Sequence, residues 1–502
     1  MLRLGDDVAR EGRISRDASH RALATLRRFR ALADSAGAER VVACATSAFR
    51  EAKNGRRLVA MLAEETGIEA RIIDGETEAS LIYSAVQASV LMEKGPVLAF
   101  DLGGGSLEVM VGDSEALWWA DSLPLGVARL TAEVVRHDPL SRGDQRRLRR
   151  RIIDQLEPVA GRVADLFDVG APGGPALAVG SGGTFCDLAR MVAYRRTGAI
   201  PVSVNQFTFS RLEFFELHEQ LLAAMASERR RMPGLELRRA DLVPAGAMLL
   251  ATAMELFGFD ELTVSEWALR EGMVLDSLRS LQPVDAAPLT ADIRRASVEA
   301  LARRCNWDEA HARHVARLAL QIFDRTHRLH RLDDEDRELL EYAALLHDIG
   351  EHVSVLAQHK HASYLIQHGR LRGFAPEEVL ALAAVARYGG RGYPKSDHVP
   401  FGSLSPKRRD RVVKVAVMLR LAAALDRGRA QVVDSVDVEL SSGRLRLTLR
   451  TNHNCELELW ATGRQSPLLE RVFGRRLDLA SAGLAPSLQP TISFDSVVAS
   501  AR

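Results

Sequence analysis

Two apolar segments that each run directly into a glycine-rich loop constrain the fold of this chain more than any other feature. Residues 97–100 lead into Asp101-Leu-Gly-Gly-Gly-Ser106, and residues 176–179 lead into Gly180-Ser-Gly-Gly-Thr184. Around both loops, short apolar stretches alternate with segments of helical periodicity, which is typical of an α/β fold. The pattern predicts strands at 40–45, 69–73, 97–100, 107–111, 116–121, 176–179 and 262–264, and helices at 16–35, 55–66, 76–92, 146–167, much of 210–257 and 268–281.

Both glycine loops have the features of a phosphate site. Consecutive glycines let backbone N–H groups approach phosphate oxygens without interference from a Cβ atom. Asp101, at a strand end, is within reach of a Mg²⁺ that bridges phosphates, and Glu108 shares a strand face with Ser106. The second loop opens a helix, whose N-terminus favours an anion. One such loop fits a plain hairpin equally well, but two of them favour phosphate binding.

Two other segments carry candidate catalytic side chains. Glu78 lies in the first turn of a predicted helix, where it could orient an attacking water or could simply compensate the helix dipole. Arg50 follows a predicted strand and could clamp a phosphate with two hydrogen bonds or could be a solvated surface residue.

Composition excludes several classes of protein. The net charge of the 502-residue chain is only +1, which argues against a bulk nucleic-acid binder, although 61 of its 67 basic residues are arginine. No run approaches the roughly 18 apolar residues of a membrane span. The N-terminus lacks an apolar signal core and the four cysteines lack metal or redox spacing, so we expect a cytoplasmic protein with free thiols.

Five motifs, taken in order, resemble one family. They are Thr46-Ser-Ala-Phe-Arg50, Gly75-x-x-Glu78-Ala79, Asp101-x-Gly-Gly-Gly-Ser106-x-Glu108, Gly180-Ser-Gly-Gly-Thr184 and Trp267-Ala-Leu-Arg-Glu-Gly272. This set is similar to the exopolyphosphatase/guanosine pentaphosphate phosphohydrolase (Ppx/GppA) family of the actin-like ATPase and sugar kinase superfamily. The resemblance covers the chain from about residue 4 to the 460s. It implies a Mg²⁺-dependent phosphoanhydride hydrolase, expected to be a homodimer, that acts on inorganic polyphosphate or pppGpp.

The resemblance also implies roles for individual residues. Glu78 matches the family's catalytic base for water and Arg50 an arginine near the substrate channel, while Asp101 and Glu108 match acidic positions of the Mg²⁺ site. The substrate-binding positions are Gly103, Gly104, Gly105, Ser106, Gly182, Gly183, Thr184 and Arg270.

The implied architecture has four parts. Residues 1–92 would form a truncated first ribonuclease-H-like domain and residues 93–284 a second one that carries the loops. An all-α HD-like domain is expected at 285–430 and a small α+β domain at 431–502, with strands at 436–440, 444–450 and 455–460. Residues 282–288 read as a linker and residues 480–502 as irregular.

Three departures from the family pattern stand out. Leu107 replaces the usual threonine after the glycine loop, and Thr77 replaces the first of two adjacent acids before Ala79. The family's N-terminal Asp-x-Gly-Ser-Asn-Ser loop and its strands are absent from the sequence, which predicts an incomplete first domain.

Histidines cluster in the predicted helical region. Ten of the 14 lie between His311 and His398. His311, His347, Asp348 and Asp426 have the order of an HD metal site and could converge from separate helices on a second divalent cation, with His359 and His361 nearby. The alternative is a metal-free helical domain with solvated histidines.

Four functions therefore stay open. The leading one is an exopolyphosphatase. The others are a pppGpp 5′-phosphohydrolase, a catalytically impaired regulator that binds polyphosphate or nucleotide, and an HD phosphohydrolase centred on His311, His347, Asp348 and Asp426.

Overall fold

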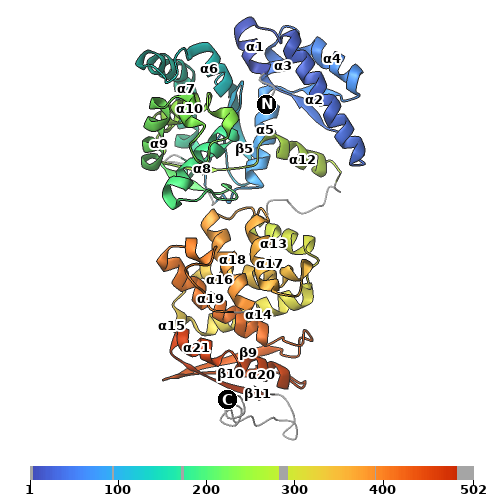
Figure 1. The fold of residues 1–502 in the computed structure, drawn as a ribbon, viewed down its shortest axis with the longest axis vertical. Helices are drawn as coiled ribbons and strands as arrows, with labels where there is room; N and C mark the ends of the chain where they lie inside the picture. Colours follow the sequence, from blue (N-terminus) through green and yellow to red (C-terminus); the bar gives the residue numbers. More distant parts are fainter. Residues whose placement is uncertain (1–3, 93–94, 171–174, 282–291, 391, 483–502) are drawn as a thin grey trace. The chain divides into compact units, whose positions relative to one another are not determined.

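The computed structural model describes residues 4–92, 95–170, 175–281, 292–390 and 392–482. The chain separates into two compact units, and each is described here by itself (Figure 1). The first unit holds residues 1–293 and 372–376, and the second holds residues 294–371 and 377–502. The predicted linker at 282–288 and nearly all of the predicted irregular tail lie outside the described residues.

A mixed six-stranded sheet is the centre of the first unit. Its strand order is β5-β4-β3-β6-β8-β7, in which β3, β6 and β8 are parallel and the other strands run antiparallel to their neighbours. The strands are β3 (Val97–Leu102), β4 (Leu107–Gly112), β5 (Leu117–Leu123), β6 (Leu177–Ser181), β7 (Thr208–Ser210) and β8 (Glu261–Val264). Every residue of β3 and β4 is buried, which explains their continuous apolar runs. The α/β prediction is confirmed, and only β7 was not anticipated.

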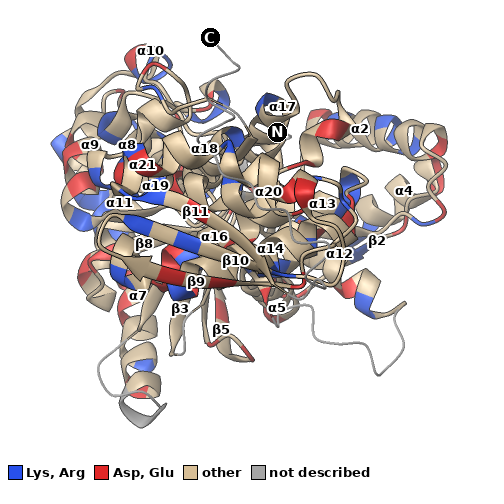
Figure 2. Ribbon diagram, turned by 90° about the horizontal axis from the view of Figure 1, so that it is seen from below, with Lys and Arg blue, Asp and Glu red and all other residues tan. Residues whose placement is uncertain are grey.

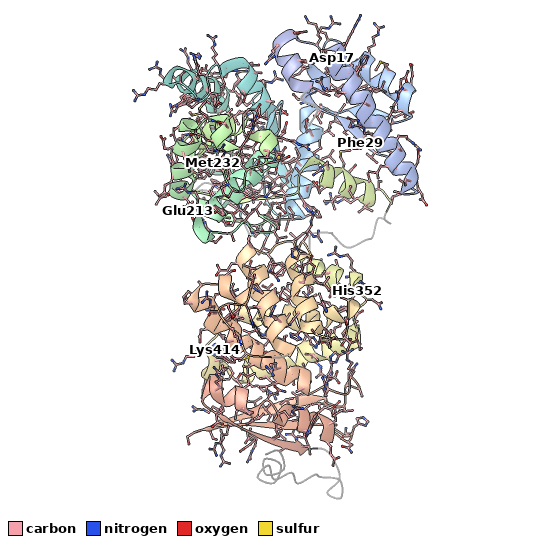
Figure 3. All side chains as sticks on the ribbon, viewed as in Figure 1. Asp17, Phe29, Glu213, Met232, His352 and Lys414 are labelled. Carbon is pink, nitrogen blue, oxygen red and sulfur yellow. The ribbon has the colours of Figure 1, made fainter. Side chains whose placement is uncertain are left out.

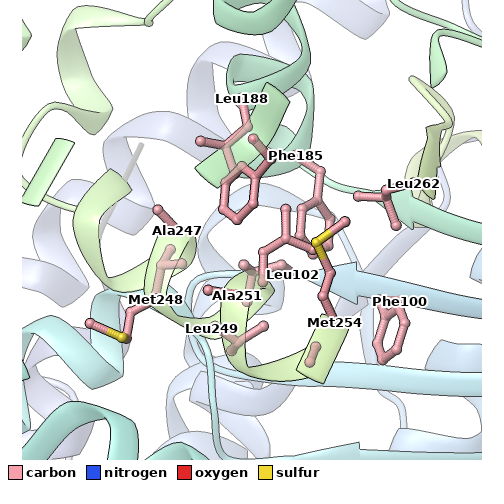
Figure 4. Packing of buried hydrophobic residues seen from close by; sticks show 14 of the residues in the cluster. Phe100, Leu102, Phe185, Leu188, Ala247, Met248, Leu249, Ala251, Met254 and Leu262 are labelled. Atoms are coloured by element: carbon pink, nitrogen blue, oxygen red, sulfur yellow. The ribbon is translucent and has the colours of Figure 1, made fainter. Parts of the chain in front are cut away.

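Helices cover both faces of this sheet. On one face, Phe100 and Leu102 of β3 pack against side chains of α8 and α11 such as Phe185 and Met254 (Figure 4). On the other face, Ala99 packs with Ile82 and Val86 of α5, as the alternation of side chains along a strand requires. The helices are α5 (Gly75–Gln87), α6 (Val127–Val134), α7 (Arg142–Gly170), α8 (Gly183–Thr197), α9 (Arg211–Ala223), α10 (Ala226–Arg229), the 3₁₀ turn η1 (Leu237–Arg239), α11 (Val243–Phe257) and α12 (Leu269–Arg279).

The N-terminal segment is mainly helical. It contains α1 (Leu4–Glu11), α2 (Arg16–Ser35), α3 (Ser47–Glu51), α4 (Gly55–Thr66) and the parallel pair β1 (Ala43–Ala45) and β2 (Ala70–Ile72). The strand expected at 40–45 is shorter than predicted, because among the described residues β1 pairs only with β2 and residues 40–42 have no partner. Val41 and Val42 consequently stay exposed, as does Phe29 on α2 (Figure 3).

The second unit is helical up to residue 424 and then forms a small sheet, as the sequence predicts. Its helices are α13 (Ile293–Arg304), α14 (Glu309–Arg325), α15 (His327–His330), α16 (Asp334–Leu346), η2 (Ile349–His352), α17 (Gln358–His368), α18 (Pro376–Gly390), η3 (Phe401–Ser403), α19 (Pro406–Ala424), α20 (Glu456–Gly463) and α21 (Ser466–Phe473). Strands β9 (Ser435–Ser441) and β10 (Arg444–Arg450) carry acidic and basic residues on their exposed positions (Figure 2). Arg450 Nε lies 2.5 Å from Asp437 Oδ2 across this pair.

One strand prediction in this region is wrong. Residues 455–460 alternate in polarity, but Cys455 is the N-cap of helix α20 and residues 456–460 belong to it, with Leu459 and Ala461 buried. The third strand is instead β11 (Arg476–Ala482), which pairs parallel to β10. Its last three residues fall in the segment that was expected to be irregular.

Two global expectations can be checked on the described residues. All four cysteines are free. No helix in the described ranges combines the length and the apolar character that crossing a bilayer requires.

Candidate active site

The two glycine loops meet at one edge of the central sheet. Parallel pairing of β3 with β6 places Asp101 opposite Ser181, and the Ser181 hydroxyl donates to Asp101 Oδ1 at 2.5 Å. Gly182 comes next, with φ +91°. A Cβ atom there would lie 2.8 Å from the Leu102 carbonyl oxygen and 3.3 Å from Asp101 Oδ1, so only glycine fits.

The first loop, Gly103–Ser106, presents unpaired backbone amides. Its carbonyls are occupied, because Gly103 and Gly104 each accept from the first amides of α6 at 3.0 Å. The Gly105 carbonyl accepts from Arg129 Nε at 2.9 Å. Among the described residues, the N–H groups of Gly104, Gly105 and Ser106 have no protein acceptor. Successive backbone amides without a protein acceptor are a feature of anion-binding loops.

Three buried carboxylates stand beside this loop. Asp101 and Glu108 face each other across the β3–β4 pair, and Ser122 of β5 donates to Glu108 Oε1 at 2.9 Å. Glu78 lies in the first turn of α5, a helix capped by Asp74, whose carboxylate accepts from Thr77 N at 2.8 Å. The exposed fractions are 6% for Glu78, 8% for Asp101 and 1% for Glu108.

Burial and mutual repulsion shift the pKa values of these acids upward. Burial raises the pKa of Glu108 to about 8, and the charges of Glu78 and Asp101 act in the same direction. Hydrogen bonds from the hydroxyls of Ser106 and Ser122 lower the pKa only in part. Burial raises the pKa of Asp101 to about 6. The pKa of Glu78 is also raised by burial, although Arg50 opposes the shift. The site therefore holds more negative charge than its surroundings neutralise.

Arg50 is the basic residue of this site that contacts a catalytic candidate. Its Nη1 atom donates to the Ile73 carbonyl at 2.8 Å and to Glu78 Oε2 at 3.1 Å. An open cavity of about 590 Å³ adjoins it and is also lined by Ser106 and Ser122. A guanidinium at the mouth of such a cavity suits the binding of an oxyanion.

Not every predicted residue joins this group. The Arg270 side chain is 89% exposed on α12, and its Nη2 atom lies 3.7 Å from Glu271 Oε1. Thr184 is buried, and a Cβ at Gly246 would lie only 2.4 Å from its methyl group, so Thr184 has a packing role. Gly183 has no side chain that could contact a ligand. Its carbonyl oxygen accepts a hydrogen bond from Arg239 Nη1 at 3.0 Å.

Glu271 and Arg239 belong to the surroundings of the site and were not predicted. Glu271 accepts from the Ala268 amide at 3.0 Å, and its charge contributes to the raised pKa of Asp101. Glu271 could have been identified from the sequence, because it follows Arg270 in the Trp267–Gly272 motif. No sequence signal pointed to Arg239, which lies 3.1 Å from Asp187.

The acidic group fits a hard divalent cation in its donor chemistry. Mg²⁺ prefers carboxylate oxygens, and a cation would offset the uncompensated charge of Asp101 and Glu108. The three carboxylates do not converge as closely as the ligands of a formed metal site. Within the described ranges, three residues with ligand atoms within 4.8 Å of one another occur only at His311, His347 and Asp348.

That second cluster lies in the second unit. His311 Nδ1 is 2.7 Å from Asp426 Oδ2, and the Nε2 atoms of His311 and His347 are each 3.4 Å from Asp348 Oδ2. Burial opposes protonation of His311, but hydrogen bonds to Asp348 and Asp426 raise its pKa to about 9. The structure thus brings together all four predicted residues of this site.

The neighbouring histidines do not join the cluster. His359 and His361 are outside the group of close ligand atoms. Instead, Gln358 Nε2 donates to Asp348 Oδ1 at 2.8 Å.

The fold is α/β, and its two glycine loops meet at one edge of the central sheet. Residues 1–281 match the model of the Ppx/GppA phosphatase family and residues 293–464 that of Ppx/GppA phosphatase domain III. Since the first match spans more than half of the chain, this protein belongs to the Ppx/GppA phosphatase family.

Individual relatives agree with the family match. A Streptomyces coelicolor protein of unassigned function is 34% identical over 60% of this chain and 85% of its own length. Exopolyphosphatase 1 of Mycobacterium leprae is 32% identical over 56% of this chain and 80% of its own. The crystal structure of a Cytophaga hutchinsonii exopolyphosphatase shares 31% identity, covers 54% and 85% of the two chains and superposes with a TM-score of 0.50.

Proposed function

We propose that the first unit hydrolyses the terminal phosphoanhydride bond of inorganic polyphosphate. The observation that carries this proposal is the set of free amides at Gly104, Gly105 and Ser106, which adjoins three buried carboxylates. Phosphoryl transfer needs mainly positioning and charge stabilisation, and this edge of the sheet offers both. Relatives that are named exopolyphosphatases support the same substrate class.

Each side chain has a role in this mechanism. Glu78 accepts a proton from the attacking water, and burial makes it a stronger base by raising its pKa. Arg50 holds Glu78 in place and contacts the phosphate, while the amides of the first loop stabilise the charge that develops on the phosphoryl oxygens.

Asp101 and Glu108 would hold the Mg²⁺ expected from the family. When bound, the cation supplies Lewis-acid neutralisation of the phosphate oxygens. Ser181 and Ser122 keep the two carboxylates in place through hydrogen bonds of 2.5 Å and 2.9 Å.

The substitution Glu78→Gln tests this function. It keeps the shape of the side chain and removes the base, so we expect phosphate release from polyphosphate to fall by roughly 10²-fold or more. Binding of polyphosphate stays measurable. The matched control is Glu64→Gln, an exposed glutamate on α4 of the same unit. Normal turnover by Glu78→Gln refutes the assignment.

The second candidate substrate is pppGpp, which presents the same terminal phosphate. No described residue of the site identifies a guanine base. Release of phosphate from polyphosphate and from pppGpp, measured in competition, separates the two. If neither substrate is hydrolysed but polyphosphate binds, the chain is instead the binding regulator.

We also propose that His311, His347, Asp348 and Asp426 hold a divalent cation in an HD-like domain. The three close ligand atoms support this. Metal analysis of the full chain is expected to find one equivalent that His347→Ala removes, and no difference between the two proteins contradicts it. If polyphosphate release also disappears in His347→Ala but not in Glu78→Gln, the chemistry belongs to this site.

Two finer expectations accompany the proposal. They are a cytoplasmic location and a homodimer in solution. Sedimentation of the purified chain tests the dimer.

A further inference from the structure

A second cavity, of about 360 Å³, lies within the second unit. One side is formed by the cluster of His311, His347 and Asp348. Another side is lined by guanidinium groups of Arg420 on α19, Arg464 after α20, and Arg427 and Arg429 in the loop that follows α19. A volume of this order is typical of small-molecule sites.

Arg420 is a half-buried cation whose hydrogen-bond acceptors are neutral, and this is the main argument for a ligand. It is half-buried, and its Nη1 donates to the Gly392 carbonyl at 2.7 Å while its Nε donates to Gln465 Oε1 at 3.2 Å. Both acceptors are neutral. Burial lowers the pKa of Arg420, which shows the cost of holding this charge. Among the described residues, no carboxylate lies within the 4.0 Å of an ion pair.

Two further guanidinium groups on the same cavity are uncompensated. Neither Arg427 nor Arg464 forms an ion pair with any described carboxylate. Arg464 lies over the ring of Trp460 at 5.0 Å, so its position is held by an aromatic face. Arg429 is different, since it is neutralised by Asp348 at 2.7 Å and by Glu351. The cavity therefore holds three guanidinium groups that form no ion pair with a described carboxylate, although Asp348, Glu351 and Asp426 also line it.

We propose that this cavity is a second ligand site, which binds a phosphorylated small molecule through Arg420, Arg427 and Arg464. Planar guanidinium forks match phosphate oxygens in geometry, and one phosphate group carries enough charge to serve several of them. Gly389 and Gly390 also line the cavity. This site is separate from the residues to which we assign polyphosphate hydrolysis.

Calorimetric titration of the full chain with inorganic pyrophosphate tests the proposal. We expect two classes of site in the wild type. Arg420→Gln removes one class or weakens it at least about tenfold, while polyphosphate hydrolysis stays unchanged. The matched control is Lys414→Gln (Figure 3), on the same helix but paired with Asp410 at 2.8 Å and outside the cavity. We expect it to keep both classes.

Arg464→Gln is the second variant, because an exposed residue can be replaced without disturbing the core. We expect it to weaken the same class of site. Wild-type binding by Arg464→Gln and by a folded Arg420→Gln overturns the proposal. Equal binding of succinate and pyrophosphate at this class overturns the assignment to phosphate.

Discussion

Among the described carboxyl groups of the first unit, Glu108 has the most strongly raised pKa, and its environment explains why. It is 1% exposed, opposite Asp101 and near Glu78, and its hydrogen bonds come only from serine hydroxyls. A neutral carboxyl is therefore favoured up to about pH 8. Since a cation needs the ionised form, the metal binding proposed for Glu108 would be linked to its ionisation.

This linkage predicts how stability varies with pH. A group whose folded-state pKa is raised from 4.5 to about 8 stabilises the fold fully below pH 4.5, and this contribution is lost as the pH rises through 8. In EDTA, we expect the melting temperature to fall between pH 5 and pH 8. Glu108→Gln should be the more stable protein at pH 8, by up to a few kcal/mol.

The control for that measurement is Glu115→Gln, an exposed position in the β4–β5 turn. It should keep the wild-type pH profile. Identical pH profiles for wild type and Glu108→Gln would show that this carboxyl does not titrate in the range.

At the residue scale, the sequence identified ligand types better than their geometry. Asp101 and Glu108 were predictable because strand alternation fixes their face. The exposure of Arg270 was not predictable, because which side of α12 packs on α5 depends on a tertiary contact: a Cβ at Gly272 would lie 2.0 Å from the Leu81 carbonyl oxygen.

Among the elements, the turn from β6 into α8 is the most constrained part of the site. Gly182 combines positive φ with close contact to the Leu102 carbonyl. Gly182→Ala therefore adds a steric clash to backbone strain, and we expect a loss of roughly 2–4 kcal/mol in unfolding free energy together with reduced polyphosphate hydrolysis.

Gly67→Ala separates these two effects. Gly67 has φ +65°, but nothing lies within 4 Å of its Cβ position, so only the backbone strain of about 1 kcal/mol applies. Denaturant unfolding of both variants gives the comparison. Equal losses at the two positions would mean that the contact with Leu102 is unimportant.

The elements also show where sequence patterns fail. Residues 455–460 alternate like a strand, yet they form the N-cap and first part of α20, and Leu457 and Trp460 stay about half exposed. The sheet edge is taken by β11, whose residues Leu477 and Leu479 alternate equally well. Short segments with the same alternation of polarity cannot be told apart by pattern alone. Tertiary pairing decides which of them becomes a strand.

At the scale of the whole molecule, near-neutral charge conceals a large number of basic groups. Of 67 basic residues, 61 are arginine, and the net charge is +1. A long polyanion that contacts several of them is more sensitive to screening than a short one.

The boundary between the two compact units, at residues 293 and 294, lies close to the predicted linker. The first two predicted domains belong to one compact unit, because they are joined by tertiary contacts that the sequence does not reveal.

We therefore predict an ionic-strength effect that depends on chain length. Raising salt from 50 to 500 mM should increase the KM for long polyphosphate roughly tenfold and that for tripolyphosphate much less. Steady-state kinetics with both substrates measures this. Equal changes in the two KM values would indicate that contacts are confined to the terminal phosphates.

The alignment of Asp101 with Ser181 also limits how this protein can change in length. One residue inserted into β6 before Ser181 would turn that hydroxyl to the opposite face of the sheet and move Gly182 away from Leu102. An insertion of two would restore the face but shift the loop along the strand. We expect insertions and deletions among descendants of this chain to fall in surface loops and to leave the lengths of β3 and β6 untouched.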